Sequence, residues 1–281
     1  GDCFAGLYWK APSAGSQNVL ARFGDAGKVA AECDVTVAVL GINKSIEREG
    51  QDRFSLELPV DQQEFIKELY KVNPNTVVVL VAGSSMAVNW MDENVPAILN
   101  AWYPGEQGGN AVAEVLFGDY NPGGRLPLTY YNSLDEIPAF DNYSVKGRTY
   151  QYFEGQPLYE FGYGLSYTKF RYKSKGVNVE QDTVKVSFEV SNTGKYDGDE
   201  VAQVYVKYPE TGTYMPLKQL HGFKRVHIKK GKTSKVTIGV PKKDLRYWDE
   251  QERKFVTPKG EYTFMVGASS EDIKFRETVG L

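Results

Sequence analysis

The chain has 281 residues, with 33 Lys or Arg against 36 Asp or Glu and a net charge of −3. This length allows two domains, each with its own core. The even charge balance argues against a nucleic-acid-binding surface, which needs a clustered basic surplus. No apolar run approaches the roughly 20 residues that cross a bilayer. From the charge balance and the lack of such a run, we expect neither nucleic acid nor membrane as a partner.

The N-terminal sequence GDCFAGLYWK contains neither an initiator Met nor the charged-then-apolar pattern of a signal peptide. We expect either that processing removed an upstream part or that the chain is a piece of a longer one. The two cysteines, Cys3 and Cys33, could form a disulfide or remain two buried thiols. Both alternatives stay open.

The first half of the chain alternates apolar runs with amphipathic segments. VTVAVLG (35–41) is a continuous β-branched run, typical of a strand buried on both faces, and Pro59 suits the first turn of a helix. The expected strands are 35–41, 76–83, 97–103 and 124–131, and the expected helices are 58–72, 84–94 (the weakest) and 108–118. Strands that alternate with helices predict a mostly parallel α/β sheet.

The second half changes to a period of two residues. In TVKVSFEVSNTG (183–194), Val184, Val186, Phe188 and Val190 fall on one face of a strand. The same alternation recurs at 203–208, 235–240 and 262–267, with turn residues between the segments. This pattern predicts an antiparallel β-sandwich that is immunoglobulin-like or fibronectin-like.

The stretch between the halves (131–167) is rich in tyrosine and phenylalanine, whereas a plain linker would be rich in Gly, Ser or Pro and poor in tyrosine. We interpret it as a segment packed between domains.

The loop GINKSIEREGQDR (41–53) carries Glu47, Glu49 and Asp52 immediately after the first predicted strand. Ligands of open α/β sheets bind beyond the carboxyl ends of the strands, so these side chains are candidate catalytic groups. The alternative from the residues alone is a solvated cluster of ion pairs without chemistry.

Other chemistries have weak support. AGSSM (82–86) lacks the G-x-S-x-G turn of serine hydrolases, and no G-x-G-x-x-G or phosphate-binding loop follows a strand. His221 and His227 have a spacing that matches no zinc motif. We therefore expect no cofactor and no metal.

Five segments together resemble glycoside hydrolase family 3, and they span nearly the whole chain in the family's order. They are IEREGQDRFSLELP (46–59), 101–129, YEFGYGLSYTKF (159–170), EVSNTGKYDGDEVAQVYV (189–206) and LKQLHGFKRV (217–226). The resemblance implies an α/β-sandwich domain at 1–150, an aromatic-rich seam at 151–164 and a fibronectin-III-like antiparallel β-sandwich domain at 165–281. It also implies a partner, a (β/α)8-type barrel domain that carries the aspartate nucleophile and is absent from this chain.

The resemblance further implies a retaining β-glycosidase, which needs two carboxyl groups roughly 5–5.5 Å apart. The I-E-x-E-G-x-D-R form, typical of xylosidase-like members, puts the general acid/base on Glu47. Glu49 is the fallback, because a two-residue slip in this loop is easy. We expect Asp52 and Arg53 to pair with each other or with Arg48 and to hold the loop.

The expected substrates are oligosaccharides with terminal β-xylosides or, second, β-glucosides, and this substrate class suggests a secreted or periplasmic protein. The alternative hypothesis is a non-catalytic module in which the sandwich binds carbohydrate or another protein and the loop carboxylates are inert.

Overall fold

The computed structural model describes residues 19–281, which form two compact units. One unit contains the described residues up to Ala113 together with 131–136, and the other contains 114–130 and 137–281. None of the helices in this part of the chain is both long and apolar enough to cross a membrane. The possible pairing of Cys3 with Cys33 involves a residue outside the described range.

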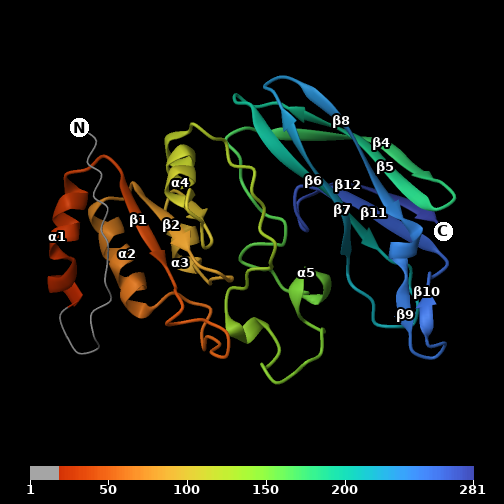
Figure 1. Ribbon diagram of the computed structural model, residues 1–281, viewed down its shortest axis with the longest axis horizontal. Coiled ribbons are helices and arrows are strands. Elements are labelled where there is room, and N and C mark those ends of the chain that lie inside the picture. Colours follow the sequence, from red (N-terminus) through yellow and green to blue (C-terminus); the bar gives the residue numbers. More distant parts are fainter. Residues whose placement is uncertain (1–18) are drawn as a thin grey trace. The chain divides into compact units, whose positions relative to one another are not determined.

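The first unit is built on a parallel sheet of three strands in the order β1-β2-β3. Its strands are β1 (Thr36–Gly41), β2 (Thr76–Val81) and β3 (Ile98–Asn100), and its helices are α1 (Val19–Ala31), α2 (Val60–Val72), α3 (Asn89–Asn94) and the first part of α4 (Gly108–Phe117). The short 3-10 turn η1 (Leu134–Glu136) also belongs to this unit. Helices α1 and α2 lie on one side of the sheet and α3 on the other (Figure 1).

The central strand of this sheet, β2, is the most deeply buried of its three strands. In β2, Val78, Val79 and Leu80 are all buried, as the continuous apolar run predicts for a strand covered on both faces. Helix α2 begins directly after Pro59, and its Ile66 and Leu69 are buried. The α/β class predicted for this half of the chain is therefore confirmed.

The expected strand at 124–131 is wrong. Tyr130 forms only an isolated antiparallel bridge with Tyr159, and Leu126 donates its N–H to the Tyr163 carbonyl at 2.8 Å. Pro127 has no N–H to donate, so a regular strand ladder is interrupted in the middle of this segment. The expected helix at 84–94 is also shorter, since only Asn89–Asn94 is helical.

The second unit is an antiparallel β-sandwich of two sheets, with strand orders β12-β11-β6-β7 and β4-β5-β8, plus the hairpin β9-β10. The strands are β4 (Phe170–Val179), β5 (Thr183–Asn192), β6 (Gly198–Lys207), β7 (Gln219–Ile228), β8 (Thr233–Pro241), β9 (Tyr247–Asp249), β10 (Lys254–Val256), β11 (Glu261–Gly267) and β12 (Ile273–Gly280). Two short helical turns, α5 (Thr149–Tyr152) and η2 (Lys242–Leu245), complete it. The predicted sandwich is confirmed.

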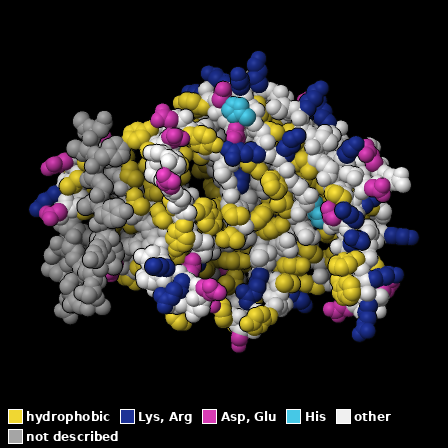
Figure 2. Space-filling view, viewed as in Figure 1, with side chains coloured by type: hydrophobic (Ala, Val, Ile, Leu, Met, Phe, Trp, Pro, Cys, Tyr) yellow, Lys and Arg dark blue, Asp and Glu magenta, His cyan; other side chains and the backbone are white. Residues whose placement is uncertain are grey.

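Alternating residues of the strands form the sandwich core. Val184, Val186, Phe188 and Val190 of β5 are all buried, and they belong to one hydrophobic cluster with residues from the opposite sheet such as Phe264. On the face seen in Figure 2, basic and acidic side chains both occur, in agreement with the small net charge.

The aromatic segment before β4 packs within the second unit. The Tyr150 and Phe161 rings stack with centroids 4.3 Å apart, and Tyr150 meets Tyr205 of β6 edge-on at 5.8 Å. Tyr159 stacks on Tyr163 at 5.2 Å. This segment therefore contributes aromatic packing to the sandwich instead of acting as a free linker.

Acid should weaken the second unit through His221. This β7 residue lies with Nε2 2.8 Å from the Tyr208 hydroxyl, and burial lowers the pKa of His221 from 6.5 to about 4. Below pH 6.5 the unfolded chain binds a proton that the folded chain rejects. Stability from this group is thus complete above pH 6.5 and falls by about 3 kcal/mol as the pH decreases toward 4.

Urea denaturation at pH 7 and pH 4 measures this effect. We expect the free energy difference between wild type and His221→Gln to change by roughly 2–3 kcal/mol in favour of the variant at the lower pH. The matched control is His227→Gln, which removes the chain's other histidine, an exposed residue beside Asp199. A wild type–His221→Gln difference that is the same at both pH values would contradict the prediction.

Candidate active site

The charged loop begins where β1 ends, and the end of this strand is held firmly. Gly41 donates its N–H to Gln62 Oε1 at 2.8 Å and accepts at its carbonyl from Gln62 Nε2 at 2.7 Å. Gly41 has φ +154°, and a Cβ there would lie 1.8 Å from the Val81 carbonyl oxygen. Only glycine allows this close approach of β1 to β2 at the start of the loop.

The loop then folds on itself through its own polar groups. Asn43 Oδ1 accepts from the Ser45 N–H at 2.9 Å, and the Asn43 carbonyl accepts from the Glu47 N–H at 3.1 Å. Arg48 and Gln51 exchange both backbone hydrogen bonds, at 3.1 and 2.9 Å, and Gly50 takes φ +73° between them. Residues 48–51 therefore form a tight hairpin, which we call the Glu49 hairpin because Glu49 lies in its turn.

Glu47 is held by two donors at one oxygen. Its Oε2 accepts from Arg53 Nε at 2.8 Å and from Ser84 Oγ at 2.5 Å, and its side chain is 25% exposed. Both donors act on the same oxygen, so Oε1 is the one that no described side chain engages.

Arg53 has only 10% of its side chain exposed, and it contacts the loop after β2 as well as Glu47. Its Nη2 donates to the Ser85 carbonyl at 2.7 Å, and its Nη1 lies 2.8 Å from Met86 Sδ. Sequence reasoning placed Arg53 beside Asp52 or Arg48 and missed the pairing with Glu47. The hydrogen bond from Ser84 to Glu47 was missed as well, because it joins residues 37 positions apart and the AGSSM segment carries no local sign of it.

Glu49 is exposed, as is Asp52. Within the described part of the chain, neither carboxylate takes part in an ion pair or a side-chain hydrogen bond. The structure thus separates the two candidate glutamates: Glu47 is anchored against the end of β2, whereas Glu49 projects from the hairpin turn. Across residues 19–281, no group of three or more His, Cys, Asp or Glu side chains is arranged to hold a metal ion.

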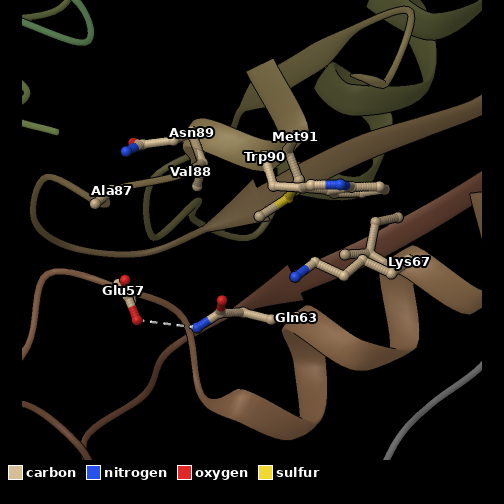
Figure 3. A pocket seen from close by; sticks show the side chains of 9 residues that line it. Glu57, Gln63, Lys67, Ala87, Val88, Asn89, Trp90 and Met91 are labelled. Atoms are coloured by element: carbon tan, nitrogen blue, oxygen red, sulfur yellow. Dashed lines mark hydrogen bonds between the residues drawn. The ribbon is translucent and has the colours of Figure 1, made fainter. Parts of the chain in front are cut away.

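A small pocket of about 180 Å³ lies beside the exit from the loop, between α2 and α3 (Figure 3). Gln63 donates to Glu57 Oε2 at 3.3 Å, and Lys67 Nζ lies 5.7 Å from the centre of the Trp90 ring. Glu57 is the one carboxylate among its lining residues. The carboxylate of this pocket is thus bonded to a neighbouring side chain of the pocket.

Comparison with family models gives two matches. The description "Glycosyl hydrolase family 3 C-terminal domain" covers residues 8–167, and "Fibronectin type III-like domain" covers residues 200–270.

Curated relatives of known name are similar over most of this chain. A xylan 1,4-beta-xylosidase from Xylanibacter ruminicola is 43% identical over 225 residues, covering 79% of this chain and 26% of that protein. A beta-glucosidase from Kluyveromyces marxianus is 38% identical over 264 residues, covering 89% of this chain and 31% of that protein. The chain thus spans well under half the length of either relative.

Solved structures share the fold. The crystal structure of the Kluyveromyces marxianus beta-glucosidase in complex with glucose matches with a TM-score of 0.87 and 35% identity, covering 93% of this chain and 33% of that one. The beta-glucosidase of Bifidobacterium adolescentis matches with the same TM-score of 0.87 at 31% identity, covering 96% of this chain and 42% of that one.

Proposed function

This chain belongs to glycosyl hydrolase family 3, and we propose that it supplies the general acid/base of a retaining β-glycosidase. The observation that carries the proposal is the Glu49 hairpin, which presents an exposed carboxyl group beyond the carboxyl end of a parallel strand. The nucleophile would come from a separate barrel domain in the longer polypeptide. The relatives, of which this chain spans only a part, support that arrangement.

The proposed chemistry proceeds in two steps. The aspartate of the barrel attacks the anomeric carbon while the acid/base carboxyl protonates the departing glycosidic oxygen, forming a covalent glycosyl-enzyme. The same group, now a carboxylate, then deprotonates a water molecule that attacks the intermediate and releases the sugar with retained configuration.

Between the two candidates, sequence reasoning favoured Glu47, and the contacts in the loop support Glu49. Glu47 already holds Arg53, whose side chain is 10% exposed, in an ion pair of 2.8 Å, and breaking a largely buried ion pair is costly. Glu49 takes part in no ion pair within the described part of the chain, and it is exposed at the hairpin turn. We therefore assign the acid/base to Glu49 and keep Glu47 as the alternative.

The substrate is proposed to be an oligosaccharide with a terminal β-xyloside, with β-glucosides second. Similarity to a protein named xylan 1,4-beta-xylosidase supports the first, and similarity to proteins named beta-glucosidase supports the second. The exact sugar depends on contacts that the barrel would supply.

The function is tested by comparing the chain with the longer polypeptide that includes the barrel. The longer protein should hydrolyse an aryl β-xyloside or aryl β-glucoside with retention, followed by proton NMR. The chain alone should not turn over either substrate, because we propose that the nucleophile comes from the barrel. Turnover by the chain alone that is abolished by a mutation within it would contradict this division of the site. Saturable xylan binding by the longer protein without hydrolysis would favour the non-catalytic module.

A further inference from the structure

The Arg53 guanidinium joins two loops at the carboxyl ends of neighbouring strands. Arginine is almost never deeply buried in proteins unless it is paired, and Arg53 contacts Glu47, Ser85 and Met86. Glu47 lies on the loop after β1, while Ser85 and Met86 lie on the loop after β2. Because β1 and β2 are adjacent and parallel, these loops leave the same edge of the sheet.

The contacts of Arg53 also close the Glu49 hairpin at its base. Glu47 precedes the hairpin and Arg53 follows it, so the ion pair between them holds its two ends together. Ser84 donates to the same oxygen of Glu47 from the β2 side. The base of the hairpin is thereby attached to the neighbouring strand through two side chains, while its turn remains exposed.

We propose that Arg53 is a positioning residue that acts through Glu47 and the 84–86 loop to fix where the Glu49 carboxyl lies. The kinetic part of this inference rests on the proposed function. Effective acid catalysis needs the carboxyl within hydrogen-bond reach of the glycosidic oxygen, and a displacement of about 1 Å can cost roughly 10²-fold in rate. Within the hairpin, Arg48 Nη1 and Gln51 Nε2 donate to the Lys44 and Ser45 carbonyls at 3.3 and 3.4 Å, which belong to the same loop, so these side chains do not join the hairpin to the loop after β2 as Arg53 does.

The proposal depends on the shape of the guanidinium as well as on its charge. Nε donates to Glu47, while Nη1 contacts Met86 Sδ and Nη2 donates to the Ser85 carbonyl on the other loop. One planar group therefore contacts both loops at the same time. A lysine ammonium is a compact charge on a flexible stem and cannot reproduce this fork. Arg53→Lys should therefore keep the charge but release the hairpin.

Amide hydrogen exchange in the chain itself tests the structural part without relying on any activity. The reporters are the N–H groups of Arg48 and Gln51, which bond to each other's carbonyls across the hairpin. In Arg53→Lys we expect both to exchange roughly tenfold faster than in wild type, since local opening becomes easier. The matched control is Arg171→Lys, an exposed arginine of β4 in the second unit, which should leave both rates unchanged. Unchanged rates in Arg53→Lys would overturn the proposal.

A kinetic cycle in the longer polypeptide tests the positioning part. Arg53→Lys should lower kcat/KM, which reports formation of the glycosyl-enzyme, by roughly 10- to 100-fold for a substrate with a poor leaving group and have little effect on kcat/KM for an activated one. A general loss of folded enzyme would lower both rates equally. When Glu49 is already alanine, Arg53→Lys should add no further leaving-group dependence, because the group that it positions is gone.

Two results of this cycle would overturn the positioning role: equal losses for both leaving groups, or a full effect of Arg53→Lys that persists in the Glu49→Ala background. A different result, in which Glu49→Ala itself shows no leaving-group dependence, would contradict the proposed function. The exchange measurement would then still decide whether Arg53 holds the hairpin.

Discussion

Glu49→Ala, made in the longer polypeptide, should lower turnover of a substrate with a poor leaving group by roughly 10²–10⁴-fold, the range typical of general acid catalysis. With an activated leaving group such as dinitrophenol, the first step needs little acid help, so the glycosyl-enzyme should accumulate and appear as a burst. Steady turnover then waits for water that has lost its base. Rates measured across a series of aryl β-glycosides check this pattern.

Glu47→Ala is the matched control, because it removes the same side chain two positions away in the same loop. If Glu47 only anchors Arg53, its loss should act through the hairpin and produce a smaller effect than loss of Glu49. The assignment moves to Glu47 if Glu47→Ala gives the burst and the leaving-group dependence and Glu49→Ala gives neither. If neither variant does, the carboxylates of this loop are structural.

Glu200→Gln should destabilise the second unit by about 3–5 kcal/mol. Glu200 and Arg125 form an ion pair of 3.0 Å with side-chain exposures of only 4% and 9%, and Glu200 Oε1 also accepts from the Val201 N–H at 2.8 Å. Burial and, second, the Glu200 carboxylate raise the pKa of Tyr172 beside the pair, so its hydroxyl stays neutral. The substitution preserves the shape of the side chain but leaves Arg125 charged, buried and without its counter-charge.

Urea denaturation measures this loss. The matched control is Lys185→Ala, which breaks an ion pair with Glu180 whose side chains are 48% and 41% exposed, and which should cost no more than about 1 kcal/mol. Replacing both buried partners with apolar residues, as in Arg125→Met with Glu200→Leu, should recover much of the loss. A cost below 1 kcal/mol for Glu200→Gln would contradict the expectation that the pair is desolvated.

The sandwich could be predicted from the sequence because apolar and polar residues alternate within single strands such as β5, and this alternation is visible without knowing which strands pair. The alternation of Val184, Val186, Phe188 and Val190 needs only a core on one side, and the structure provides it. The segment 124–131 was misassigned because its apolar residues resemble a strand locally. Its backbone instead bonds to the 159–163 segment, a long-range pairing that no local pattern reveals.

The location of the candidate site was predictable, whereas its internal contacts were not. A charged loop after a buried strand is visible in the sequence, and the structure places this loop at the end of β1. The pairing of Arg53 with Glu47 and with the Ser85 carbonyl depends on which strand lies next to β1 and on how the loop folds back. Sequence spacing alone favours the nearer Asp52 as a partner, so the anchored and the exposed glutamate could not be distinguished.

The most direct measurement of the central claim is the product that Glu49→Ala forms in the presence of azide, again in the longer polypeptide. Azide attacks the glycosyl-enzyme without needing a general base, so it should restore turnover of an activated substrate. The account predicts a β-glycosyl azide, with retained configuration, identified by proton NMR, and none from Glu47→Ala. An azide product from Glu47→Ala alone, or no azide product from either variant, would contradict the assignment of the acid/base to the Glu49 hairpin.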